Sequence, residues 1–275
     1  MNNQLQNKPK FSLAIQSEGY KRLINNTLGD QKRAAKFIAA ISSAVATNPS
    51  LQQCEAGSIL SGALLGEALN LSPSPQLGQY YLVPFKDKAQ FQLGYKGYIQ
   101  LAIRSGQYKD IDVIEVREGE YLGRDKITGK HQFEFIEDEV ERENKPIIGY
   151  MAYFEYLNGF YKNLYWSKEK MQKHALEYSQ AYASDVKKGT NYSFWTKDFN
   201  GMAFKTMLRQ LISKWGIMSI DMQEALTKDM SVVKEDGTYD YVDNQPVMEV
   251  PSEERVEQTA ETTTVEVKQV NINEL

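Results

Sequence analysis

The stretch QFQLGYKGYIQLAIRSG, from Gln90 to Gly106, decides how the middle of this chain is expected to fold. Its first four residues alternate between polar and apolar side chains, which is the period of a half-buried strand. From Tyr95 onward the apolar residues recur at helical spacing, and Gly106 occupies a position typical of a helix C-terminus. The sequence therefore predicts a strand that runs directly into a helix.

The predicted helix carries a polar ridge that suits nucleic acid. Lys96, Gln100 and Arg104 recur at every fourth position, so they lie along one side of the helix, with Tyr95 close by. Lysine and arginine pair with phosphate, and aromatic rings stack on bases of any sequence. We therefore expect these four residues to contact single-stranded nucleic acid.

A second informative stretch, WTKDFNGMAFKTMLRQLISKWG, runs from Trp195 to Gly216. At about 100° per residue its large apolar residues share one helical face, and Lys205 and Arg209 lie together roughly a quarter-turn away. The predicted helix is thus apolar on one side and cationic beside it. Phosphate contact is the functional interpretation of the two cations, and a structural role beside the core is the alternative.

The other periodic segments predict an α+β fold, with a helical N-terminal part and an antiparallel sheet packed on helices. Asn158-Gly159 is the strongest turn signal and predicts a tight hairpin. The segment GRDKITGKH, residues 123–131, is interpreted as a long hairpin tip that carries Arg124, Lys126 and Lys130. Further helices are expected at 33–47, 55–71, 171–183 and 221–230, and strands at 80–85, 89–93, 111–116, 133–136, 147–157 and 160–166.

Charge divides the chain into a mildly basic body and an acidic end. Residues 229–275 contain twelve acidic and three basic residues, a net charge of −9, so residues 1–228 carry +5 of the total of −4. A small total charge is compatible with phosphate binding, because the local field matters more than the sum. We expect a flexible segment at 1–30, a folded domain at 31–230 and an acidic disordered tail at 231–275.

Composition also limits the setting of the protein. The single cysteine, Cys54, excludes an internal disulfide and a cysteine-based zinc site. The N-terminal residues lack the apolar segment of a signal peptide, and no run of 18 apolar residues occurs. We expect a cytoplasmic protein with no membrane partner.

Motifs for covalent chemistry are missing from the sequence. Residues 123–131 have the wrong glycine spacing for a phosphate-binding loop and carry His131 where a hydroxyl is required. The acidic run at 137–143 could hold Mg²⁺ for a nuclease, although such runs are more often solvated. The GYKG string, residues 94–97, matches the GxxG loop of an RNA-binding module at only two positions. A binding protein without catalytic residues, metal site or cofactor is the better interpretation, with Mg²⁺ at most modulating DNA binding.

Taken together, the two long stretches resemble the RecT family of phage and prophage single-strand DNA annealing proteins. They occur in the same order as in that family and are separated by a Tyr-rich β region. LLGEALNLSPSP and YYLVPF, which precede the first stretch, add to the resemblance, which covers residues 32–222. The acidic tail at 231–275 adds nothing to the resemblance.

This resemblance implies an ATP-independent recombinase that coats single-stranded DNA and anneals it to a complementary strand. It implies a fold of the Red-beta and RecT type, a homo-oligomeric ring or helical filament, and a bacterial host cell. A partner exonuclease is implied as well, with a host single-strand-binding protein as a further candidate. The domain at 31–230 would then serve DNA annealing and oligomerisation. The DNA groove is carried over to Lys96, Arg104, Lys197, Lys205 and Arg209.

Two other classes of function remain open on the sequence. A Mg²⁺-dependent nuclease would shorten a labelled strand. A recombination scaffold that recruits other proteins through its acidic tail would show no DNA affinity in its body.

Overall fold

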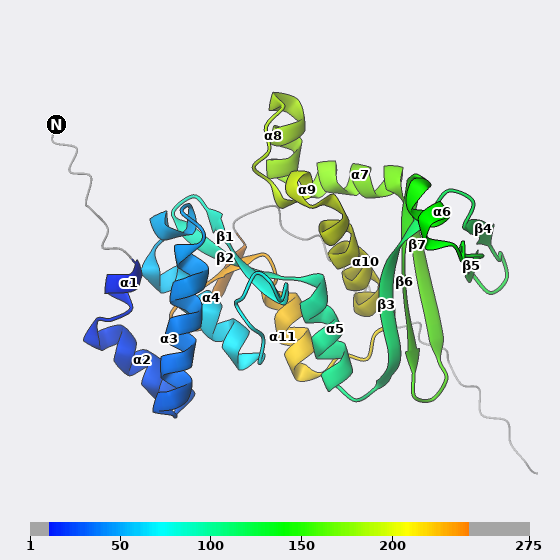
Figure 1. Ribbon diagram of the computed structural model, residues 1–275. Coiled ribbons are helices and arrows are strands. Elements are labelled where there is room, and N and C mark those ends of the chain that lie inside the picture. Colours follow the sequence, from blue (N-terminus) through cyan, green and yellow to red (C-terminus); the bar gives the residue numbers. More distant parts are fainter. Residues whose placement is uncertain (1–10, 242–275) are drawn as a thin grey trace, which may run out of the picture. The chain divides into compact units, whose positions relative to one another are not determined.

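The N-terminal part of the protein is helical. The computed structural model describes residues 11–241, which belong to the unit Met1–Gln245 (Figure 1). The expected helices at 33–47 and 55–71 are confirmed, with ends shifted by up to three residues. Asp30 begins the longest one by accepting a hydrogen bond from the amide of Lys32. The helical elements here are α1 (Phe11–Ala14), α2 (Glu18–Leu28), α3 (Gln31–Ala46), the 3-10 turn η1 (Leu51–Gln53) and α4 (Ala56–Ala68).

Residues 11–28 are part of the folded unit, which corrects the expected flexible segment at 1–30. They form α1 and α2, which bury Phe11 and Ile24 and pack on α3. Tyr20, Leu23, Ile24 and Leu28 recur at helical spacing, so the sequence itself carries the signal for α2. These residues are buried or pack against the core because α3 offers a surface for them to cover. Residues 1–10 lie outside the described residues.

An antiparallel four-stranded sheet packs against α4. The β1–β2 hairpin turns at Lys86 and Asp87, as predicted, and Lys86 adopts a φ of 54°. Small residues in α4 let β1 approach closely, since a Cβ at Gly66 would overlap the ring of Tyr80. The strands, in sheet order, are β1 (Tyr80–Phe85), β2 (Lys88–Leu93), β8 (Ser231–Val233) and β9 (Tyr239–Tyr241).

The strands β8 and β9 correct the expected start of the disordered tail at residue 231. Ser231 pairs with Phe91 in β2, and Val232 and Val233 are buried. A three-residue strand has too short a period to be recognised in sequence. It forms because β2 offers an unpaired edge. The rest of the expected tail, residues 242–275, lies outside the described residues.

Helix α5 (Tyr95–Arg104) begins directly after β2, as the opening stretch predicts. At its start Gly94 and Gly97 are buried against the backbone of residues 78–79. A Cβ at Gly94 would overlap the carbonyl oxygen of Gly78, and one at Gly97 would overlap that of Gln79. The GYKG string is therefore a packing motif within this fold, and its glycines do not form an exposed backbone clamp.

A second antiparallel sheet has the order β3-β6-β7. The predicted Asn158-Gly159 turn joins β6 to β7, and Gly159 has a φ of 83°. A separate β4–β5 hairpin carries the predicted tip. The elements of this region are β3 (Tyr108–Arg117), β4 (Tyr121–Arg124), β5 (His131–Phe133), α6 (Glu139–Asn144), β6 (Ile147–Tyr156) and β7 (Tyr161–Ser167).

The long helix α10 packs on the second sheet and against α5 (Figure 1). The predicted helix at 195–216 divides at Asp198, which leaves helical backbone and caps α10 through the amide of Gly201. The predicted helix at 171–183 divides at Ser179 in the same way. These elements are α7 (Lys168–Tyr178), α8 (Gln180–Lys188), α9 (Phe194–Lys197), α10 (Phe199–Trp215) and α11 (Ile220–Lys228).

The predicted α+β class, with antiparallel sheets packed on helices and a helical N-terminal part, is confirmed. Across residues 11–241, no helix combines the length and the apolar character that crossing a bilayer requires.

The tight start of α5 can be tested with Gly97→Ala. Alanine favours helix, but its Cβ would collide with backbone that cannot rotate away, so the free energy of unfolding should fall by about 1–3 kcal/mol. Gly19→Ala in α2 is the matched control, because a Cβ there meets nothing within 4 Å. Thermal unfolding should show a lower midpoint for the first variant and an unchanged or higher midpoint for the second. If Gly97→Ala unfolded at the same midpoint temperature as the wild-type protein, α5 would not depend on this close approach.

Candidate nucleic-acid interface

The two informative stretches of the sequence meet at one pocket. It has a volume of about 190 Å³ and lies between the β1–β2 hairpin with the start of α5 and the segment formed by α9 and the start of α10. Three aromatic rings from three elements line it, those of Tyr81, Tyr95 and Phe194. The ring centroids of Tyr81 and Phe194 are 6.0 Å apart. Tyr81 and Phe194 are 113 positions apart in the chain, so distant segments form one aromatic site.

Two of the expected cations flank this pocket and are exposed. The Nζ atom of Lys96 lies 5.9 Å from the ring centroid of Tyr95, and that of Lys197 lies 5.9 Å from the ring centroid of Phe194. Each cation is thus held beside a pocket ring while its charge faces solvent. Of the expected site residues, this geometry brings together Lys96, Lys197, Tyr95 and the buried Lys205.

Asp185 on α8 holds the α9 side of the pocket in place. Its carboxylate accepts hydrogen bonds from Thr190 Oγ1 at 2.6 Å, from the amide of Ser193 at 2.7 Å and from Thr196 Oγ1 at 2.8 Å. The bond from Thr190 is the main cause that keeps the pKa of Asp185 well below its usual range, and the bonds from Ser193 and Thr196 add to it. These contacts tie the segment before Phe194 to α8, so that this wall is preorganised.

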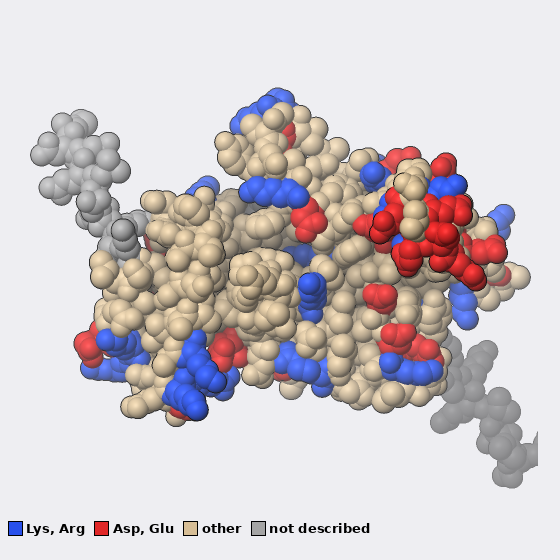
Figure 2. All heavy atoms as spheres, viewed as in Figure 1, with Lys and Arg blue, Asp and Glu red and all other residues tan. Residues whose placement is uncertain are grey.

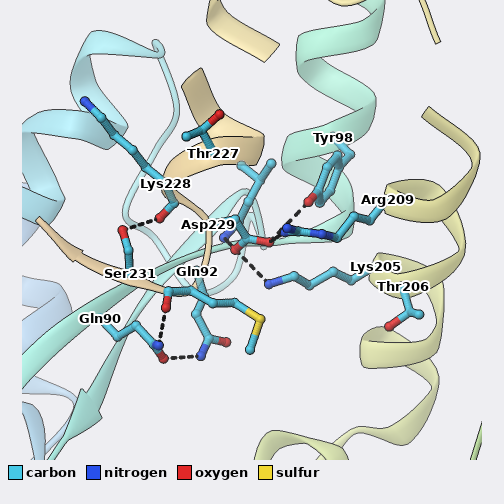
Figure 3. Close-up of polar contacts among 12 residues, drawn as sticks. Gln90, Gln92, Tyr98, Lys205, Thr206, Arg209, Thr227, Lys228, Asp229 and Ser231 are labelled. Atoms are coloured by element: carbon cyan, nitrogen blue, oxygen red, sulfur yellow. Dashed lines mark hydrogen bonds and ion pairs between the residues drawn. The ribbon is translucent and has the colours of Figure 1, made fainter. Parts of the chain in front are cut away.

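Lys205 and Arg209, which were expected in the groove, instead turn toward Asp229 (Figure 3). Lys205 Nζ lies 2.9 Å from one carboxylate oxygen of Asp229, and Arg209 Nη1 lies 2.7 Å from the other. The two cationic side chains are only 7% and 14% exposed, and the Asp229 side chain is fully buried. A structural role therefore fits this pair better than direct contact with phosphate.

The Asp229 cluster joins four elements around one carboxylate. Besides the two cations, Asp229 accepts hydrogen bonds from the backbone amide of Leu93 at 2.8 Å and from the Tyr98 hydroxyl at 3.2 Å. Asp229 follows α11, Leu93 ends β2, Tyr98 is on α5 and the cations are on α10. Burial lowers the pKa of Lys205, and pairing with Asp229 opposes that shift. With Lys205 protonated, the cluster carries one net positive charge, and Lys205 also lines the pocket.

The other expected contacts lie away from the pocket. Arg104 is about 12 Å further along α5 than Lys96 and donates to the carbonyl oxygens of Leu69, at 2.6 Å, and Asn70, at 3.3 Å. Arg104 thereby provides hydrogen-bond donors for carbonyl groups at the C-terminal end of α4, which lack partners within the helix. Gln100 is exposed on the same helix.

The hairpin tip forms a separate basic surface. Arg124, Lys126 and Lys130 are exposed on the β4–β5 hairpin, which Figure 1 shows across the second sheet from α5. Two hydrogen bonds between Asn163 and the backbone of His131 fasten the hairpin to β7. The hairpin is therefore held at the pair Arg124–His131, where the loop of its tip begins and ends, and its three cations are exposed. This structure does not bring the tip to the pocket.

The acidic run at 137–143 forms the N-terminal part of α6 and the turn before it. Its five carboxylates are exposed and gather on the face over α6, as Figure 2 shows. Arg142 anchors this helix through an ion pair of 2.6 Å with the buried Glu120. Within residues 11–241, no group of three or more His, Cys, Asp or Glu side chains is placed to hold a metal ion.

Three residues central to this geometry are missing from the sequence-based site, namely Tyr81, Phe194 and Asp229. The period of two in YYLVPF could have placed Tyr81 on the face opposite the buried Tyr80. Phe194 lies directly before the second stretch. No sequence pattern distinguishes Asp229, because it directly precedes an acidic segment whose charges are expected to be solvated.

The Asp229 cluster can be tested by the pH dependence of stability. At neutral pH, Asp229→Asn should lower the free energy of unfolding by about 3–5 kcal/mol, because two buried cations lose their carboxylate. Burial alone would raise the pKa of Asp229, but Lys205 and Arg209 outweigh it and hold the pKa below its ordinary value. A carboxyl group of this kind stabilises the fold at pH values above its pKa in the unfolded chain, which is about 3.9. This stabilisation is lost as the pH falls below that value and through the lower pKa that the group has in the folded protein.

The difference between wild type and Asp229→Asn should therefore narrow below about pH 4, as measured by denaturant unfolding at a series of pH values. Asp221→Asn, at an exposed position in the first turn of α11, is the control and should cost less than about 1 kcal/mol. If the difference in free energy of unfolding between wild type and Asp229→Asn stayed constant from pH 7 to pH 3, the assigned ion pairs would be contradicted.

Comparisons with known proteins identify the family of this chain. Residues 35–246 match the family model described as RecT family. The chain is 41% identical over 212 residues to the uncharacterized protein YqaK of Bacillus subtilis strain 168, covering 77% of this chain and 68% of YqaK. It is 29% identical over 210 residues to Protein RecT of Escherichia coli K12, covering 71% of each chain. The matched region contains both stretches that form the pocket, and this chain belongs to the RecT family.

Proposed function

We propose that this protein is an ATP-independent annealing protein that binds single-stranded DNA and pairs it with a complementary strand during homologous recombination. Family membership supports annealing in recombination as the general activity. The observation that carries the finer proposal is the convergence of both sequence stretches on an aromatic pocket flanked by the exposed Lys96 and Lys197. Rings with adjacent cations are the features by which proteins hold single strands of any sequence.

Annealing needs no covalent step, but it requires two strands of like charge to approach. Lys96 and Lys197 would contact the phosphates of the first strand and release its condensed counterions. Contacts to the backbone leave the pairing edges of most bases open to a second strand. The free energy of the reaction then comes from base pairing, which explains why ATP is not required.

Lys205 and Arg209 would act indirectly. Because two cations share one carboxylate, the Asp229 cluster leaves a positive charge beneath the pocket. That charge is buried, where solvent screens it less than at the surface. In this proposal the cluster positions the start of α10 and favours a polyanion above it, without touching phosphate.

The hairpin tip would provide a second contact, either to the DNA or to an adjacent subunit. Arg124, Lys126 and Lys130 are exposed on a hairpin that lies across the second sheet from α5, where a strand or a neighbour that continues past one subunit could reach them. We further propose a homo-oligomeric filament or ring, a partner exonuclease that generates the single strand, and a host single-strand-binding protein as an additional partner. No cofactor enters this mechanism, and Mg²⁺ would modulate DNA binding only.

The reaction itself is tested by mixing the protein with one labelled strand and then with its complement, in Mg²⁺ and without ATP. Conversion of the label to duplex, faster than in a protein-free control, is the expected result. A shortened label would favour the nuclease instead. Retention of full-length single strand with no bound protein would favour the scaffold.

The role of the exposed cations predicts a change in salt dependence. Lys96→Ala combined with Lys197→Ala should weaken binding to oligo(dT) and reduce the log-log salt slope by about 0.7 per lost phosphate contact, about 1.4 for the pair. The measurement is fluorescence anisotropy at several salt concentrations. Lys168→Ala with Lys173→Ala, two exposed lysines on α7, removes the same charge elsewhere.

This control variant should keep the slope of the wild-type protein, which separates a local contact from an effect of total charge. Equal slopes for both variants would contradict the assignment of Lys96 and Lys197. The same titration with Arg124, Lys126 and Lys130 changed to Ala separates the two roles of the hairpin tip. A lower slope would indicate contact with DNA, and an unchanged slope with altered assembly would indicate contact with another subunit.

A further inference from the structure

We propose that the aromatic pocket takes one nucleobase turned out of the bound strand. This inference rests on the proposed function and makes it more specific: besides the phosphates at the rim, each subunit would hold a base. The lining is mostly apolar, with Leu93 and Met202 between the rings of Tyr81, Tyr95 and Phe194. A concave site with a small number of polar groups among aromatic side chains is typical of a pocket for a planar small ligand.

The polar groups of the pocket determine which part of a nucleotide can enter it. Gln92 can donate to or accept from the edge of a base, and the carboxylate of Asp198 accepts only. Asp198 caps α10 through the amide of Gly201, at 2.9 Å, so its position in the wall is fixed. The amino or imino group of a base could donate to this carboxylate, whereas a phosphate can reach the exposed Lys197 at the rim without entering the pocket.

Charge at the rim complements this arrangement. Lys96 and Lys197 are exposed, and each lies beside one of the pocket rings. A base inside the pocket would therefore leave its flanking phosphates within reach of two cations. Lys205, which also lines the pocket, is already paired with Asp229. Its charge therefore needs no phosphate partner inside the pocket, and it still provides a positive potential next to a bound base.

This arrangement has a consequence for annealing. A base inside the pocket cannot pair, so the complementary strand must compete for it, and the pocket must empty as duplex forms. Turning out a base costs least when the strand is single, because no partner has to be separated from it. The pocket would thus hold single strands in preference to duplex, and would do so without reading sequence, since every base has an aromatic face.

The experiment compares Phe194→Leu with wild type on two oligonucleotides of equal length, oligo(dT) and the same backbone with abasic sugars. Leucine retains the apolar volume and removes the aromatic face. Tyr192→Leu, two positions away and 78% exposed, is the matched control outside the pocket. Tyr81→Leu is a second pocket variant, which keeps the test valid if Phe194→Leu fails to fold, as judged by circular dichroism.

The wild-type protein and Tyr192→Leu should bind oligo(dT) more tightly than the abasic strand. The pocket variants should lose about tenfold in affinity for oligo(dT) and little for the abasic strand. Their salt slopes should match that of wild type, because no phosphate contact is removed. Pocket variants that bind both strands as wild type does, with normal annealing, would overturn the base pocket and leave the proposed function standing.

Two further results would also overturn the inference. If the wild-type protein bound free thymidine monophosphate as tightly as oligo(dT), the pocket would be a site for a free nucleotide and not for a base within a strand. If the pocket variants lost self-association and kept oligo(dT) affinity, the site would belong to a side chain of a second copy. Absence of oligo(dT) binding by the wild-type protein would instead reject the proposed function itself.

Discussion

One buried carboxylate sets the geometry on which the candidate site depends. Asp229 receives donors from β2, α5 and α10, and these are the elements that carry the two informative sequence stretches. A charge removed from water is stable only if partners surround it, so the three elements cannot separate without exposing or orphaning it. The cluster thereby fixes α10 against α5 and the end of β2. The pocket is formed on one side of this junction.

The five basic residues that the sequence predicts in the groove thus divide between two tasks. Lys205 and Arg209 serve the interior, and Arg104 satisfies the end of α4. Lys96 and Lys197 keep their charges in solvent beside aromatic rings. Cations that look equivalent in a helical period therefore differ in what they can bind. Only those with a free face can exchange counterions for phosphate.

Annealing places opposite demands on a protein, since it must hold a strand and yet give up its bases. In the proposed mechanism, rim cations that contact phosphate would meet the first demand without covering pairing edges. The aromatic pocket would meet both demands, because a stacked base is held by a contact that pairing can outcompete. The preorganised wall formed through Asp185 means that little ordering is needed when a strand binds.

Local pattern by itself determined most elements of this protein. The strand-to-helix unit at 90–106 and the Asn158-Gly159 hairpin follow from periods and turn residues, which are properties of neighbours in sequence. The hairpin tip at 123–131 is predicted as well, but its strands lie at 121–124 and 131–133, whereas the sequence predicts a strand at 133–136. The sequence also placed Lys96 and Lys197 in the stretches that form the site.

Only the tertiary structure decided which cations are buried, that β8 completes a sheet, and that Tyr81 faces Phe194. These outcomes depend on contacts between residues far apart in the chain. A helical period shows which side chains share a face, but it cannot show what that face will meet. Asp229 illustrates the limit, because the same carboxylate would be solvated in a tail and is buried here only because three other elements surround it.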